Sequence, residues 1–142
     1  EREELQRQRL KIILDKKPVC FNHNLETIER LQREVRRGAN YKSSLNLLKM
    51  SKNIYPNIET KSGIMLGLGE SLEEIKNTIL DLKKVKCNQI TIGQYLRPSL
   101  NHLPVKKYWE PKEFEYIEKF SKQLGFNKVS CGPLIRSSYH AG

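Results

Sequence analysis

The stretch TKSGIMLGLGES, residues 60–71, decides the fold class together with the segment that follows it. Its apolar core over 64–68 is continuous rather than alternating, which is typical of a strand covered on both faces. Ser71 and Glu74 then form a capping-box pair at the start of a helix predicted over 72–86. One apolar stripe runs along that helix: Leu72, Ile75, Ile79, Leu82 and Val85. A buried strand that leads into an amphipathic helix predicts a parallel sheet with crossover helices.

Predicted strands and helices alternate in the same way toward both ends of the chain. We expect strands over 18–21, 60–66, 89–93 and 128–131, and helices over 2–16, 25–36, 41–55, 72–86 and 111–124. Pro111 in a first turn and Gly125 after a last turn are the usual helix boundaries. With no internal repeat or low-complexity linker, residues 1–142 are expected to be one α/β unit. Doubly wound and barrel folds both fit, and in either the site lies at the carboxyl ends of the strands.

The composition is that of a globular protein, with 37% hydrophobic and 30% charged residues among 142. A net charge of +10 is compatible with an anionic partner. Because the lysines are scattered along the chain, a solvated surface is the preferred interpretation. No apolar run approaches the length of a membrane span. The opening residues mix acids with bases, unlike a signal or transit peptide, and begin with Glu1 rather than Met. We therefore expect an amino-terminal part to be missing.

The three cysteines, Cys20, Cys87 and Cys131, lie far apart, and no CxxC or CxxxCxxC motif occurs. An odd and dispersed set argues against a disulfide scaffold and against an iron–sulfur site made by this segment alone. Buried, unpaired thiols are the favoured interpretation.

Each predicted strand is followed by a small polar or glycine-containing group. The groups are Asn22, His23, Asn24 and Glu26; Gly67, Gly69 and Glu70; Gln94, Tyr95 and Arg97; and Gly132, Arg136, Ser137, Ser138, Tyr139 and His140. In a parallel sheet these four groups share one edge, which makes the tail RSSYHAG part of a site rather than a frayed end. Asn24 and Glu26 alone have an equal interpretation as caps of helix 25–36. Metal binding by His23 and His102 is not expected, and Trp109, Phe114 and Phe120 are expected in the core.

The segments FNHNLETI, YKSSLNLLK, TKSGIMLGLGES, ITIGQYLRPSLNHLPVKKY and CGPLIRSSYHA resemble lipoyl synthase, in order and from Pro18 to Ala141. The resemblance implies the carboxyl-terminal portion of a radical S-adenosylmethionine (SAM) enzyme on a parallel-stranded partial (β/α) barrel. Such enzymes insert two sulfur atoms at C6 and C8 of an octanoyl chain attached to a lysine. They use SAM and two 4Fe-4S clusters, whose cysteine ligands would lie outside this chain. Alone, the chain is therefore expected to be inactive.

The resemblance also implies roles for single residues. Cofactor contacts are implied for Asn24, Glu26, Lys61, Ser62, Gly63, Met65, Gly67, Glu70, Gln94 and Leu96. Asn24 and Glu26 would meet the ribose of SAM, and Lys61 and Ser62 its methionine or carboxylate side. Ser138, with Ser137 as the alternative, would be the serine ligand of the auxiliary cluster. Arg136 would offset the cluster's charge or orient a substrate carbonyl.

Partners implied by the resemblance are octanoylated lipoyl-carrier domains of 2-oxoacid dehydrogenases and of the glycine cleavage system. We expect no nucleic acid, no membrane and a monomer. The net charge keeps an alternative open, a basic α/β RNA-binding module, although no RNP signature occurs. A barrel enzyme with a phosphate ligand at GLGES is a third interpretation. Abundant Lys, Asn and Ile favour a plastid or mitochondrion of an AT-rich eukaryote and leave a bacterial cytoplasm open.

Overall fold

A computed structural model describes residues 2–16, 20–38 and 40–135. In this part of the chain four strands form one sheet in the order β1-β2-β3-β4, and every neighbouring pair is parallel. The strands are β1 (Cys20–Asn22), β2 (Glu59–Leu66), β3 (Gln89–Gln94) and β4 (Lys128–Cys131). The predicted α/β class with a parallel sheet is confirmed, and the sheet is consistent with a partial (β/α) barrel.

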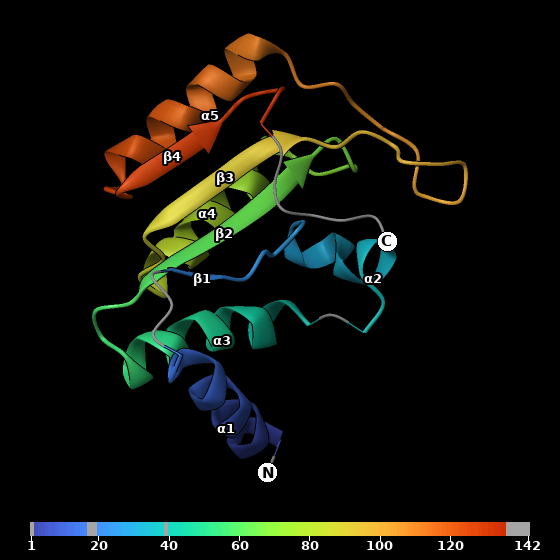
Figure 1. Ribbon diagram of the computed structural model, residues 1–142. Helices are drawn as coiled ribbons and strands as arrows, with labels where there is room; N and C mark the ends of the chain where they lie inside the picture. Colours follow the sequence, from blue (N-terminus) through green and yellow to red (C-terminus); the bar gives the residue numbers. More distant parts are fainter. Residues whose placement is uncertain (1, 17–19, 39, 136–142) are drawn as a thin grey trace.

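Helix α1 precedes the sheet, and the other helical elements connect its parallel strands, which need crossover connections. They are α1 (Arg2–Leu14), the 3₁₀ turn η1 (Glu29–Leu31), α2 (Gln32–Val35), α3 (Tyr41–Ile54), α4 (Leu72–Lys84) and α5 (Pro111–Gln123). Figure 1 shows α4 behind β2 and β3, with α3 beside β1 and α5 beside β4. No described helix is both long enough and apolar enough to cross a membrane.

The main core lies between the sheet and helices α3, α4 and α5. Alternate residues of β2 and β3 face these helices, namely Ile64, Leu66, Ile90 and Ile92. They pack with residues that are almost completely buried, namely Leu48, Ile75, Ile79, Leu82, Phe114 and Ile117. Since side chains alternate along a strand, residues 61, 63, 65, 91 and 93 belong to the opposite face, called here the inner face.

The predicted helix boundaries rest on signals that the structure confirms. The Ser71 hydroxyl accepts from the Glu74 amide (3.2 Å), and the Glu74 carboxylate accepts from the Ser71 amide (3.0 Å). Pro111 stands in the first turn of α5, where its missing N–H leaves no bond unmade. Trp109 and Phe114 are buried, as expected.

The predicted helix over 25–36 is wrong. Residues 24–28 are extended or bent, Glu26 forms an isolated bridge with Ile64, and the helical part is split into η1 and the four-residue α2. The apolar stripe is real, but its members pack into two different clusters: Leu25 into the main core, and Ile28 and Leu31 into a second one. Tertiary packing therefore overrides the helical pattern here.

Candidate active site at the carboxyl edge of the sheet

The carboxyl ends of the strands meet at one edge, as the sequence predicts. Glu26 bridges to Ile64 of β2, Ile64 pairs with Ile92 of β3, and Ile92 pairs with Cys131 of β4. The segments that follow these positions therefore lie side by side across the sheet. In α/β proteins this edge is where ligands bind.

Glu26 has the most unusual environment at this edge. Its φ is +71°, a left-handed conformation that is uncommon for a residue with a side chain. Its amide donates to Gly63 O (3.0 Å) and its carbonyl accepts from the Met65 amide (2.9 Å), so the strained residue is built into the sheet. The side chain is only 6% exposed. Backbone strain that surrounding structure maintains is commonly found at functional sites.

One oxygen of the Glu26 carboxylate is available to a ligand. Oε2 is buried and has no hydrogen-bond partner among the described residues. Burial raises the pKa of Glu26, while the positive charge of Arg36 and a side-chain hydrogen bond with Asn24 lower it. A buried polar atom without a partner is costly, and a ligand hydroxyl would remove that cost. Residues 29–36, called here the α2 region, comprise η1, α2 and the C-cap Arg36. Because the N-cap of this region is Ile28, which makes no side-chain cap bond, the interpretation of Asn24 and Glu26 as caps is wrong.

The inner face of β2 and β3 carries small residues at 63, 91 and 93, beside Lys61 and Met65. A methyl group on Gly63 would overlap Thr91 Oγ1 and would lie 3.2 Å from Asn24 Oδ1. Thr91 Oγ1 is buried and, like Glu26 Oε2, lacks a partner in the described part of the chain. Two buried oxygens with unused hydrogen-bonding capacity, Glu26 Oε2 and Thr91 Oγ1, thus lie near the buried Gly63.

The end of β4 turns back across this inner face. The Gly132 amide donates to Ile92 O (3.0 Å), and the Ile135 amide then closes a turn onto Gly132 O (3.2 Å). A methyl group on Gly93 would collide with the Ile135 carbonyl, so the two backbones are in close contact. Arg136, Ser137 and Ser138, predicted as site residues, lie outside the described residues, but the segment that leads to them lies against β3.

Three of the predicted cofactor residues are engaged within the fold. The Ser62 hydroxyl, fully buried, accepts from the Leu25 amide (3.2 Å). The Glu70 carboxylate accepts from the Gly67 amide (2.9 Å), the Leu68 amide (3.2 Å) and Trp109 Nε1 (3.0 Å). These side chains hold the loops of the site in place.

Gln94 does the same for the chain that enters α5. Its amide nitrogen donates to Lys107 O (2.9 Å) and Tyr95 O (3.1 Å), and its oxygen accepts from the Trp109 amide (2.9 Å). Gly67, with φ +112°, lies so close that a methyl group there would overlap the Gln94 side chain. The glycine is required both by its conformation and by this contact.

The remaining predicted residues differ in exposure. Met65 is buried in the second cluster with Ile28, Leu31, Leu68 and Tyr95, at the carboxyl edge. Lys61 is half-buried, and it pairs with Asn22 in the β1–β2 register. Leu96 is 57% exposed.

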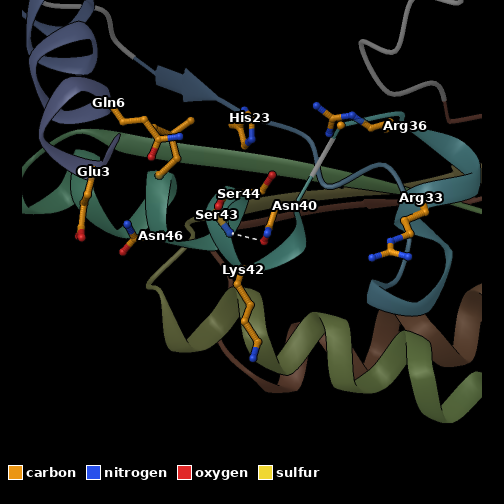
Figure 2. Close-up of a pocket in the computed structure, with 12 residues that line it drawn as sticks. Glu3, Gln6, His23, Arg33, Arg36, Asn40, Lys42, Ser43, Ser44 and Asn46 are labelled. Atoms are coloured by element: carbon orange, nitrogen blue, oxygen red, sulfur yellow. Dashed lines mark hydrogen bonds between the residues drawn. The ribbon is translucent and has the colours of Figure 1, made fainter. Parts of the chain in front are cut away.

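A polar cavity of about 730 Å³ opens beside this edge (Figure 2). Side chains from α1, from the α2 region and from the start of α3 surround it, together with His23 at the end of β1. Arg33, Arg36 and Lys42 give it positive charge, and the Asn40 side chain caps α3 by accepting from the Ser43 amide (3.1 Å). Burial and Arg36 lower the pKa of His23, which favours its neutral form. With Glu3 as the acidic side chain in the lining, the cavity keeps an excess of positive charge, which favours a polar, anionic ligand.

The cysteines make no cluster in the described chain. Cys20, Cys87 and Cys131 are all unpaired, and burial raises the pKa of each thiol, to about 11 for Cys87 and about 12 for Cys131. Within residues 2–16, 20–38 and 40–135 no three His, Cys, Asp or Glu side chains are grouped so that they could hold a metal ion.

The parallel sheet makes this an α/β protein, consistent with the partial-barrel class, and its polar carboxyl edge is the candidate site. Comparison with known proteins gives the family. The chain is 73% identical over all 142 residues to "Lipoyl synthase 2" of Prochlorococcus marinus subsp. pastoris, 48% of whose length it covers. It is 53% identical over 137 residues to "Lipoyl synthase 2" of a Nostoc species, and 52% identical over 132 residues to "Lipoyl synthase" of Proteus mirabilis. These matches take in 96% and 93% of the chain, and 46% and 41% of those two proteins.

The chain belongs to the lipoyl synthase family, and the resemblance seen in its sequence segments is confirmed. It spans about half the length of the curated relatives that it matches. No family model matches the chain. The alternative of an RNA-binding module gains no support from these relatives.

Proposed function

We propose that this chain is the carboxyl-terminal portion of a radical-SAM lipoyl synthase, forming over 1–142 one part of its barrel domain. The whole protein would insert two sulfur atoms at C6 and C8 of an octanoyl chain held on a lysine of a carrier protein. The observation that carries the proposal is the 73% identity, over the entire chain, with a protein named Lipoyl synthase 2. The polar carboxyl edge of a parallel sheet supports it independently.

The described residues fit SAM as a ligand. Bound SAM and two 4Fe-4S clusters would supply the radical and the sulfur in such an enzyme. Glu26 Oε2 is buried and without a partner, and a carboxylate in that state is suited to the two hydroxyls of a ribose. Asn24, which hydrogen-bonds the same carboxylate, would orient it. Gly63 and Gly93 let neighbouring groups lie directly against the backbone of the inner face: Thr91 and Asn24 at Gly63, and the Ile135 carbonyl at Gly93.

The other cofactor residues divide into two roles in this proposal. Met65, Gly67 and Leu96 contribute apolar or backbone surface beside the adenine, and Lys61 contributes charge toward the carboxylate. Arg33, in the neighbouring cavity, adds to that charge. Ser62, Glu70 and Gln94 act by fixing the loops that carry these contacts, since their side chains are hydrogen-bonded within the fold.

The tail supplies the serine ligand of the auxiliary cluster in this proposal, with Ser138 as the ligand and Ser137 as the alternative. Arg136 offsets negative charge beside it. The support from the structure is the course of residues 132–135, which cross the inner face at Gly93 and so start the tail at the site. The cysteine ligands of both clusters would come from residues beyond this chain.

Octanoylated carrier domains of 2-oxoacid dehydrogenases and the H protein of glycine cleavage are the proposed substrates, acted on by a monomer. The relatives named above are bacterial, and two of them are cyanobacterial. That origin supports a cyanobacterial or plastid setting over a mitochondrion.

Glu26→Gln in the full-length protein tests the cofactor site. Because the change removes a charged acceptor from a buried site, SAM affinity should fall by about 1.5–3 kcal/mol, or tenfold or more. Binding is measured by equilibrium dialysis with the clusters assembled, and the iron content is measured alongside. Glu29→Gln is the control, since Glu29 is exposed and three residues away. Unchanged affinity in Glu26→Gln would remove Glu26 from the site.

The tail is tested by Ser138→Ala and Ser137→Ala, each assayed for deoxyadenosine and for lipoyl product on an octanoylated carrier. Ser138→Ala should still form deoxyadenosine and make no lipoyl product. If only Ser137→Ala has that effect, Ser137 is the ligand. Normal product from both variants would leave the tail without a catalytic role.

A further inference from the structure

The backbone around Glu26 is held from two sides. Toward β2, the Glu26 amide and carbonyl bond to Gly63 and Met65. Away from β2, three neighbouring carbonyls accept from side chains of the α2 region: those of Asn24, Leu25 and Thr27. Because buried backbone groups need partners, the residues that supply these bonds determine whether the segment can keep its conformation.

Gln32 supplies two of the three bonds. It is only 4% exposed, and its Nε2 donates to Leu25 O (2.9 Å) and to Thr27 O (2.7 Å). These carbonyls belong to the two residues that flank Glu26, so one amide group spans the left-handed residue. Its own Oε1 is buried and has no partner in the described part of the chain. The Gln32 side chain therefore makes this bridge although its own buried oxygen is unsatisfied among the described residues, which is uncommon in folded proteins.

Arg36 supplies the third bond. Its Nη1 donates to Asn24 O (2.8 Å), and its charge lowers the pKa of Glu26 against the effect of burial. The Arg36 amide in turn donates to Gln32 O (2.8 Å), so the two residues are joined through the short helix α2. The same guanidinium therefore fixes the backbone before Glu26 and favours the ionised state of its carboxyl group.

We propose that Gln32 and Arg36 are positioning residues, which act through Glu26 to keep its carboxylate aimed at the cofactor site. The inference rests on the proposed function, because it takes SAM as the ligand of Glu26. Without the bridge made by Gln32, residue 26 can relax toward the common negative-φ region, which turns the carboxylate away. Neither residue needs to touch the ligand.

A double-mutant cycle on SAM binding tests this, with the full-length protein and SAM itself as the probe. The single variants are Gln32→Met, of similar length but without donors, and Arg36→Gln; each is also combined with Glu26→Gln. We expect each single variant to weaken SAM binding by about tenfold, and to add little once Glu26 is changed, because coupled residues are not additive. Gln123→Met and Arg37→Gln, both at exposed positions, should leave the affinity unchanged.

The outcomes separate the two proposals. If Glu26→Gln has no effect on SAM binding, the proposed cofactor site fails. If Glu26→Gln weakens binding while Gln32→Met and Arg36→Gln do not, or if the losses add in full, the positioning role is overturned. Thermal unfolding of every variant is recorded, since a merely structural role would lower the melting temperature without changing affinity in the folded protein. If Gln32→Met does not fold, the SAM affinities of Arg36→Gln and of the charge-retaining variant Arg36→Lys test the proposal instead. A higher affinity in Arg36→Lys than in Arg36→Gln supports it, and equal affinities contradict it.

Discussion

Replacing Glu70 by alanine should strongly destabilise the protein, because Glu70 ties two loops together at the site. Its carboxylate accepts three hydrogen bonds: from the Gly67 amide at 2.9 Å, from the Leu68 amide at 3.2 Å, and from Trp109 Nε1 at 3.0 Å. The residue is 7% exposed. Alanine would leave all three donors without their acceptor in a largely buried place.

The size of the effect follows from the number of donors. Each buried donor that loses its partner costs about 1–3 kcal/mol. The bond at 3.2 Å is the weakest of the three, and water entering the space left by the carboxylate would satisfy part of the loss. We therefore expect Glu70→Ala to lower the free energy of unfolding by about 4 kcal/mol, a large share of the ~5–15 kcal/mol of a typical domain. Trp109→Phe removes only one bond and should cost about 1.5–3 kcal/mol.

Urea unfolding of the full-length protein, followed by circular dichroism, measures both changes and the double variant. The two losses should be less than additive, because both variants break the same Trp109–Glu70 bond. Glu73→Ala, at an exposed position in the first turn of α4, is the control and should change little. A loss below about 1 kcal/mol for Glu70→Ala, the size of one ordinary hydrogen bond, would refute the structural role assigned to this carboxylate.

Further outcomes test other parts of the structure. Burial, and to a lesser extent the hydrogen bond to Asp81 (2.7 Å), raises the pKa of Tyr41 above its ordinary value. The protonated Tyr41 hydroxyl therefore contributes its full stabilisation of the folded state below about pH 10, and this contribution is lost as the pH rises further. Tyr41→Phe should therefore show a smaller alkaline loss of stability than the parent in unfolding measured from pH 8 to 11. With a pKa of about 11, Cys87 is roughly one-thousandth thiolate at pH 8, so maleimide should leave it unlabelled until urea unfolds the protein, and rapid native labelling found by mass spectrometry would contradict its burial. Ser71→Ala should cost about 1 kcal/mol in unfolding free energy through loss of the α4 cap, whereas the control Ser43→Ala, at an exposed position in the first turn of α3, should cost little.

The regular elements were predictable from the sequence because their signals are local. Strand 128–131 and the start of helix 72–86 agree with the structure at their boundaries, and the capping box at Ser71 depends only on residues three apart. The end of each strand is also local information, so the gathering of polar groups at one edge followed once the strands were taken as parallel.

The environment of Glu26 could not be predicted in the same way. Its positive φ arises because bonds to Gly63 and Met65, about forty residues away in sequence, pull the segment into the sheet. The apolar spacing of Leu25, Ile28 and Leu31 is compatible with one helix and also with packing into two separate clusters. Only the tertiary contacts show which of the two arrangements forms. The bracing role of Gln32 had no sequence signal at all, since glutamine within a helical pattern is ordinary.

The inner face of the sheet explains why the apolar run of β2 is continuous. Ile64 and Leu66 meet the helices, as any strand of a parallel sheet would require. Their alternates are covered without a helix: Gly63 by Asn24 and Thr91, and Met65 by the cluster that contains Ile28. Across the register, Met65 pairs with Gly93, over which the end of the described chain returns. The glycines at 63 and 93 allow this covering, since a side chain at either position would collide with Thr91 or with the Ile135 carbonyl.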